Sequence, residues 1–200
     1  DPDDAEARAN LAIALFRCGR FPEAAEHAET AVAADPKSPD ALNVRALLFE
    51  REGKLAEADR LLAKAAKLDP DRYPAPVRFD RATFEAEVVR AGEMLPEEFR
   101  RHLAEVPVIV EDLPSDEILL DENPPLDPEL LGLFVGTALT ERTFSSPAQE
   151  PARILLFQRN LERYVVDAEE LREEIAKTLH HELGHYLGFD EEGLEQIDLA

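Results

Sequence analysis

Two histidines and a glutamate near the C-terminal end carry the donor atoms best suited to chemistry. His181 and His185 lie four residues apart in a segment with a helical pattern, so their imidazoles project from one face about one turn apart. At that spacing two imidazoles can share one zinc ion. Glu182 lies on the same side of the helix and can act as a general base on a water molecule without being a ligand. The alternative is a charged, solvated helix with two neighbouring histidines.

A zinc site that does chemistry needs a third protein ligand and an open coordination position. Gly188 allows the chain to reverse directly after the helix, and Glu191 follows His185 by six residues. This spacing resembles the extended metzincin motif, with an acid in place of its third histidine. We therefore predict that Glu191 completes a site for one zinc ion. Asp190 is its competitor, and the remaining alternative is that both acids are solvated charges of an acidic tail.

The helix that must present these residues is predicted from about residue 167 to residue 188. Asp167 and Glu170 form a variant of the capping box at its start, and Gly188 suits the left-handed conformation that ends a helix. The opposite face carries an apolar stripe made of Leu171, Ile175, Leu179 and Leu183. This stripe should face the core and leave the histidine face free to line a cleft.

Three short apolar segments are predicted to be strands. They span residues 106–111, 130–136 and 153–157, and each is bounded by prolines, glycines or polar residues. Residues 113–128 are acidic and contain four prolines, which predicts a loop. Strands and helices in this order predict a small α+β domain over residues 77–200.

The first 72 residues contain an internal repeat. Asp-Pro pairs begin at positions 1, 35 and 69, which are 34 residues apart, and the segments between them align without gaps. Small residues recur at equivalent positions, as Gly19 and Gly53 do. The period and these small residues resemble the tetratricopeptide repeat. Each unit is therefore predicted to form two amphipathic helices with a glycine at the turn between them.

Two such repeats seldom stand alone, because each buries its apolar face only against a neighbour. Either further repeats are missing upstream of Asp1, or a later element covers the stack. A helical pattern follows the proline-rich connector at residues 73–76. Its apolar face carries Phe84, Val88, Ala91 and Leu95. This helix is the predicted cap of the repeats.

Charge is unevenly distributed along the chain. The sequence has 22 basic and 44 acidic side chains, a net charge of −22, and residues 75–200 hold 29 of the acids but 11 of the bases. Such a surface repels phosphate backbones and anionic membranes, so we expect no nucleic-acid partner and no membrane partner. It attracts cations, metals included, although solubility alone would also explain much of the acidity.

The cysteine content and the absence of long apolar runs bear on the compartment. Cys18 is the single cysteine, so no internal disulfide framework exists, and a reducing compartment is favoured. No run of about 18 apolar residues is present, so no transmembrane helix is expected. The chain begins at Asp1 without a methionine or a signal-like segment, as a fragment or processed form does. We expect a cytoplasmic protein.

The second domain resembles a known family in several segments. These are, in chain order, residues 95–98, 108–114, 130–136, 154–157 and 181–188. In content, order and spacing they resemble the small bacterial zincin-like metallopeptidases. The resemblance implies a minimal α+β zincin fold in which a strand beside the active-site helix holds an extended peptide. Family members tend to carry aspartate where this chain has Glu191, and no methionine turn can follow the motif because the only methionine is Met94.

Together these features predict α-helical tetratricopeptide-type repeats over residues 1–72 and a zincin-like α+β domain over residues 77–200. The predicted function is zinc-dependent hydrolysis of peptide bonds in a peptide or protein substrate, with Glu182 as the base. The repeats are predicted to bind a protein partner. The alternative is a protein-binding repeat module whose zinc site is structural or vestigial.

Overall fold

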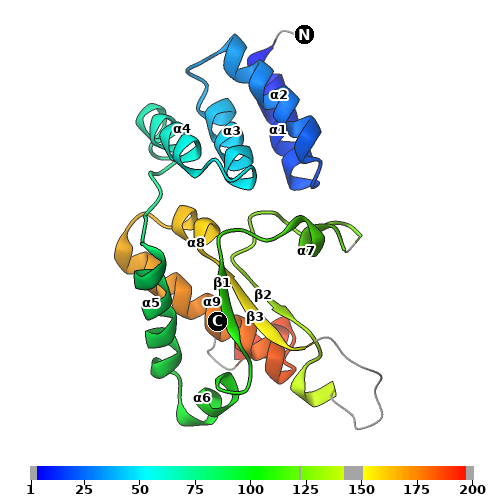
Figure 1. Cartoon of the computed structure of the whole chain (residues 1–200), viewed down its shortest axis with the longest axis vertical. Coiled ribbons are helices and arrows are strands. Elements are labelled where there is room, and N and C mark those ends of the chain that lie inside the picture. The colour runs from blue at the N-terminus through cyan, green and yellow to red at the C-terminus, as the bar shows by residue number, and fades with distance from the viewer. Residues whose placement is uncertain (1–3, 122, 142–150, 197–200) are drawn as a thin grey trace. The chain divides into compact units, whose positions relative to one another are not determined.

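The computed structural model describes residues 4–121, 123–141 and 151–196 (Figure 1). Contacts divide the chain into two units. The first comprises Asp1–Pro76 and Leu113–Glu129, and the second comprises Val77–Asp112 and Leu130–Ala200. The long connection between the first two strands therefore packs with the repeats, although it lies within the sequence of the second domain. None of the described helices is long and apolar enough to cross a membrane.

Two helical hairpins form most of the first unit. Its long helices are α1 (Ala5–Arg17), α2 (Phe21–Ala34), α3 (Pro39–Arg51) and α4 (Leu55–Leu68) (Figure 1). Both predicted turn glycines adopt left-handed conformations, Gly19 with φ of 70° and Gly53 with φ of 73°. Repeat alanines such as Ala12, Ala24 and Ala58 are fully buried, because their small side chains allow the helices to pack closely. The predicted helical repeats are confirmed.

The connection between the first two strands covers one end of these hairpins. It contains the short helix α7 (Asp116–Leu120), whose Leu119 is fully buried. Arg51 lies over the ring of Phe21 at 4.1 Å, donates to the Pro114 carbonyl at 3.2 Å and pairs with the carboxylate of Asp116. A segment that the sequence indicated to be a plain loop therefore contributes apolar and charged contacts to the repeat unit.

The helix predicted to cap the repeats has a different partner. Helix α5 (Arg81–Met94) belongs to the second unit, and its apolar face lies in one core cluster with the long helix α9 (Ala168–Leu187). The capping prediction was wrong because the apolar pattern of α5 does not specify which apolar surface it meets. The buried stripe of α9 supplied that surface.

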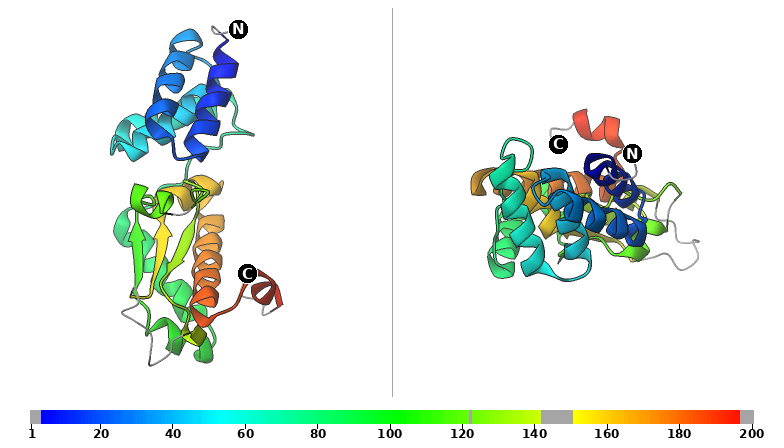
Figure 2. Two further views of the ribbon diagram at one scale, coloured as in Figure 1. Left: turned by 90° about the vertical axis from the view of Figure 1, so that its right-hand side faces the viewer. Right: turned by 90° about the horizontal axis from the view of Figure 1, so that it is seen from above.

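A three-stranded sheet forms the centre of the second unit. Its strands are β1 (Val108–Glu111), β2 (Gly132–Val135) and β3 (Arg153–Phe157), in the spatial order β1-β3-β2. β3 pairs in parallel with β1 and antiparallel with β2. Figure 2 shows α9 running along one face of the sheet. Among the strands that the structure describes, β1 and β2 are both edges.

Helix α9 begins and ends where the sequence indicates. Asp167 caps its first turn by accepting the N–H groups of Glu169 and Glu170, at 2.8 and 3.0 Å. Gly188 follows its last residue with φ of 95°. The predicted stripe from Leu171 to Leu183 is fully buried against α5 and the sheet, and this burial fixes the rotation of α9 about its axis.

Several short elements of the second unit were not predicted. They are α6 (Glu97–Leu103), the 3₁₀ turn η1 (Leu139–Glu141), α8 (Gln158–Tyr164) and α10 (Glu191–Gln196). Helices of so few residues contain too few turns to show an apolar period, and contacts with the rest of the domain stabilise them.

Helix α8 has a buried polar face. The side chain of Glu162 is 1% exposed and pairs with Arg78 at 2.8 Å. The same carboxylate accepts the Phe79 N–H at 3.0 Å and the Gln158 side-chain amide at 2.8 Å. The Val77 N–H adds a bond to the Glu162 carbonyl at 2.9 Å. A buried carboxylate is tolerated only when such partners replace water, so these contacts attach the start of the second unit to α8.

We expect Glu162→Ala to lower the free energy of unfolding of the second unit by roughly 3 kcal/mol, because Arg78, Phe79 and Gln158 lose their acceptor together. Denaturant unfolding followed by circular dichroism measures the change. Glu173→Ala, at an exposed position of α9, is the matched control and should change the stability by less than about 0.5 kcal/mol. Equal effects of the two substitutions would contradict the buried network.

Candidate metal centre

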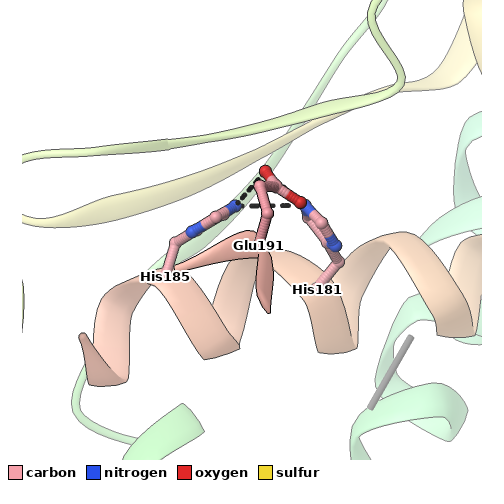
Figure 3. A group of neighbouring side chains, drawn as sticks. All are labelled: His181, His185 and Glu191. Atoms are coloured by element: carbon pink, nitrogen blue, oxygen red, sulfur yellow. Dashed lines mark hydrogen bonds and ion pairs between the residues drawn. The ribbon is translucent and has the colours of Figure 1, made fainter. Parts of the chain in front are cut away.

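The two histidines of α9 bring their Nε2 atoms to one point above the helix (Figure 3). Nε2 of His181 and Nε2 of His185 are 3.0 Å apart, and the rings meet edge to face with centroids 4.7 Å apart. Both side chains are about 30% exposed, at 32% and 28%, so they face accessible space. The helical spacing predicted from the sequence thus produces a close nitrogen pair.

Glu191 adds a carboxylate to this pair (Figure 3). Its Oε1 lies 3.4 Å from Nε2 of His185 and 3.7 Å from Nε2 of His181, and the three donor atoms lie within 4.8 Å of one another. Glu191 is the first residue of α10, and its side chain is 76% exposed. The structure therefore brings together the three residues that the sequence indicated as ligands.

Helix α10 is held in place by close packing on α9. Leu194 of α10 is buried, and it packs so closely over Gly184 of α9 that a Cβ at Gly184 would collide with it. Asp190 precedes α10 and accepts the Gly193 N–H at 2.9 Å, as a helix-capping residue does. The carboxylate of Asp190 is thus occupied by backbone, while that of Glu191 is directed at the histidines.

The spacing of the donors can be compared with what zinc requires. Zinc binds imidazole nitrogen and carboxylate oxygen at about 2.0–2.2 Å in a tetrahedron, so its ligand atoms lie about 3.3–3.6 Å apart. The three distances here, 3.0, 3.4 and 3.7 Å, bracket that value. Two nitrogens and one carboxylate oxygen also match the ligand set of a zinc site with one open position. The residues present therefore fit a zinc ion.

The hydrogen bond of His185 and the pKa of His181 also suit a metal ligand. Nδ1 of His185 lies 3.1 Å from the carbonyl oxygen of Phe189. Because a carbonyl only accepts, Nδ1 of His185 must carry the hydrogen, which leaves the lone pair of Nε2 free for a cation. Burial, and then repulsion from His185, lowers the pKa of His181 below its ordinary value. The neutral imidazole, which is the form that binds metal, is favoured at that position.

Glu182 lies one residue from the first histidine but points to the sheet. It is 7% exposed, and one carboxylate oxygen accepts the Phe134 N–H of β2 at 2.7 Å. Burial raises the pKa of Glu182 to about 7, and the hydrogen bond from Phe134 partly opposes that rise. A carboxyl group with such a pKa can take up and release a proton near neutral pH.

Gly132 of β2 makes room for this carboxylate. A Cβ at Gly132 would lie 2.6 Å from Cγ2 of Thr178 and 3.0 Å from Cγ of Glu182. Sequence reasoning missed Gly132, Phe134 and Phe189 as parts of the site. An isolated glycine within a predicted strand indicates that another element approaches the strand closely, so the close contact at Gly132 could have been predicted. The backbone groups of Phe134 and Phe189 carry no such signal, since every residue has them.

Other residues near the motif have packing roles. Nε2 of His180 lies 3.2 Å from the carbonyl oxygen of Ala91 on α5, away from the paired histidines. Tyr186 is fully buried and packs edge to face on Phe134, with ring centroids 5.8 Å apart. Neither side chain is directed at the three donor atoms.

Fold and site together define the class of protein: helical repeats followed by a small α+β domain whose longest helix carries a two-histidine, one-carboxylate cluster. Residues 103–200 match the family model of zincin-like metallopeptidases, and residues 1–39 and 9–73 match that of the tetratricopeptide repeat. The chain thus carries a zincin-like metallopeptidase domain after tetratricopeptide repeats, as the resemblance implied. The comparison with curated proteins gives no match.

We expect His181→Ala and His185→Ala each to abolish the binding of one zinc ion at neutral pH, because two remaining ligands hold zinc poorly. Elemental analysis of the purified variants measures the zinc content. His180→Ala is the control and should keep one zinc ion, since His180 faces α5. Full zinc content in both ligand variants would place the metal elsewhere.

The third ligand is tested by a pair of neighbouring substitutions. Glu191→Ala should weaken zinc binding by more than about 100-fold, because it removes a ligand atom. Asp190→Ala should weaken it by about 10–100-fold at most, because it loosens only the first turn of α10. Competition with a chelator ranks the two variants. Loss of zinc from Asp190→Ala with retention in Glu191→Ala would assign the role to Asp190.

Proposed function

We propose that the C-terminal domain is a peptidase that uses one zinc ion held by His181, His185 and Glu191, with Glu182 as its general base. The observation that carries this proposal is the combination of two kinds of group at one place. Three donor atoms lie within 4.8 Å of one another, and Glu182, the residue directly after His181 in α9, is a buried carboxylate that takes no part in that cluster. A structural zinc site has no need of such an additional carboxylate.

The edge of β2 supports an extended peptide as the substrate. The Leu131 carbonyl accepts the Phe157 N–H of β3 at 2.9 Å, so alternate residues of β2 bond to β3. The backbone groups of Gly132 and Phe134 then point away from β3, and the Phe134 N–H meets Glu182 there. Because Glu182 occupies the Phe134 N–H, a peptide would pair with the backbone groups of Gly132 and with the Phe134 carbonyl, and it would lie beside the proposed base.

Hydrolysis of a peptide bond requires two proton transfers. When bound, zinc would supply a Lewis acid that polarises the substrate carbonyl and lowers the pKa of a water molecule. The carboxylate of Glu182 takes one proton from the attacking water and delivers it to the nitrogen of the leaving amine as the carbon–nitrogen bond breaks. Burial next to β2 keeps competing water away from that carboxylate.

The repeats are proposed to bind a protein partner or to recruit the substrate. The helical hairpins supply the exposed surface on which such repeats usually recognise other chains. The single cysteine, Cys18, is free, and a reducing cytoplasm remains the proposed compartment.

We expect Glu182→Gln to keep one zinc ion and to lower the rate of peptide hydrolysis by about 100-fold or more, because glutamine preserves the shape but cannot accept the proton. Zinc content and cleavage of a broad library of fluorogenic peptides are measured on the same samples. Glu173→Gln, at an exposed position of α9, is the matched control and should keep full activity.

The alternative function gives a different result in the same assay. A wild-type protein that holds zinc, cleaves no library peptide and binds a protein through residues 1–72 would be a binding module with a structural or vestigial metal site. Equal hydrolysis by wild type and Glu182→Gln would refute the role of Glu182.

A further inference from the structure

A groove lies at the sheet edge formed by β1, apart from the candidate metal centre. It has a volume of about 400 Å³, and it is lined by α5 and β1, with Arg100 and Leu103 of α6 also contributing to its wall. Apolar side chains dominate its lining, with Val88 and Val89 from α5, Val108 and Val110 from β1, and Leu179 of α9. Figure 1 shows α5 running roughly alongside β1.

The backbone of β1 offers hydrogen-bonding groups to this groove. The Ile154 N–H of β3 donates to the Pro107 carbonyl at 2.9 Å. The backbone groups of every second residue of β1, counted from Pro107, therefore point toward β3. The N–H and carbonyl groups of Val108 and Val110 then point away from β3, toward the free edge. Within the described residues β1 pairs only with β3, so this edge can accept one more strand.

Helix α5 presents a regular stripe to the same groove. Glu85, Val89 and Glu93 all line it, at intervals of four residues. All three are exposed, Val89 by 62%, and neither glutamate forms an ion pair in the part of the chain that the structure describes. Arg100 also lines the groove, but it is paired with Glu97 at 2.7 Å. The stripe is therefore acidic, apolar and acidic in turn.

The distance between successive residues of this stripe is close to the distance between side chains on one face of a strand. Four helical residues advance about 6.0 Å along α5, and side chains on one face of a strand recur about every 6.6–6.8 Å. Val108 and Val110 both line the groove, so side chains on the same face of an added strand would line it as well. Over two steps the mismatch is about 1.5 Å, which a long flexible side chain such as lysine can absorb.

We propose that the groove between α5 and β1 binds an extended segment of another protein with the pattern basic-x-apolar-x-basic. The segment adds a fourth strand beside β1, its apolar side chain meets Val89 and Leu179, and its two basic side chains reach Glu85 and Glu93. A second copy of this chain is disfavoured as the occupant, because each copy carries a net charge of −22. The proposal does not depend on the zinc site.

The probe for this site is a blocked peptide containing Lys-Thr-Val-Thr-Lys, titrated against the full chain in the Glu182→Gln background, in which we expect cleavage to be at least about 100-fold slower. We expect saturable binding by fluorescence anisotropy. Glu85→Lys combined with Glu93→Lys should weaken it about tenfold or more, since both attractions become repulsions. Glu6→Lys combined with Glu26→Lys, exposed acids of the repeats, gives the same net charge and should change the affinity less than about twofold.

A second peptide tests the strand pairing itself. The same sequence with N-methyl groups on alternate residues cannot donate to the edge of β1, and it should bind at least about tenfold more weakly. The proposal is overturned if the unmodified peptide does not bind, if the two charge-reversed proteins lose affinity equally, or if the N-methylated peptide binds as well. A chelator that removes zinc should leave the affinity unchanged, so failure of the metal site would not be mistaken for failure of the groove.

Discussion

The buried stripe of α9 is the contact on which the second unit depends. Its four aliphatic side chains, from Leu171 to Leu183, are removed from water by α5 and the sheet. Burial of each such side chain stabilises a fold by about 1.5–3 kcal/mol, so rotating α9 about its axis would be costly. With that rotation fixed, His181 and His185 can only face the opposite side, and the carboxylate of Glu182 can only meet β2.

Two glycines let other elements approach α9 closely enough to complete the site. Gly132 admits the side chain of Glu182 beside β2, and Gly184 admits Leu194, which brings the start of α10 over the histidines. At each place a methyl group would fill the space that the neighbouring side chain occupies. The donor cluster thus depends on backbone proximity as much as on the donor residues themselves.

The two edges of the sheet face different chemical groups. At the β2 edge a backbone N–H is held by the carboxylate of Glu182, which connects strand pairing to the candidate catalytic group. At the β1 edge the backbone groups face an apolar groove with Glu85 and Glu93 on its rim. Among the described strands, β1 and β2 each pair only with the middle strand β3, so each has one edge without a strand partner. The excess of acids in this half of the chain favours basic segments at either edge.

The sequence by itself determined the repeats, the strands, the long helix and the pairing of His181 with His185, because each depends on the period of a single element. Two side chains four residues apart in a helix always lie on one face, whatever surrounds them.

Tertiary structure alone decided that Glu191 reaches the histidines while Asp190 caps α10, and that Glu182 meets the Phe134 N–H. It also decided that α5 packs on α9 and that residues 113–129 pack with the repeats. Such contacts join segments distant in sequence, and apolar or acidic patterns specify that a partner is needed without specifying which one.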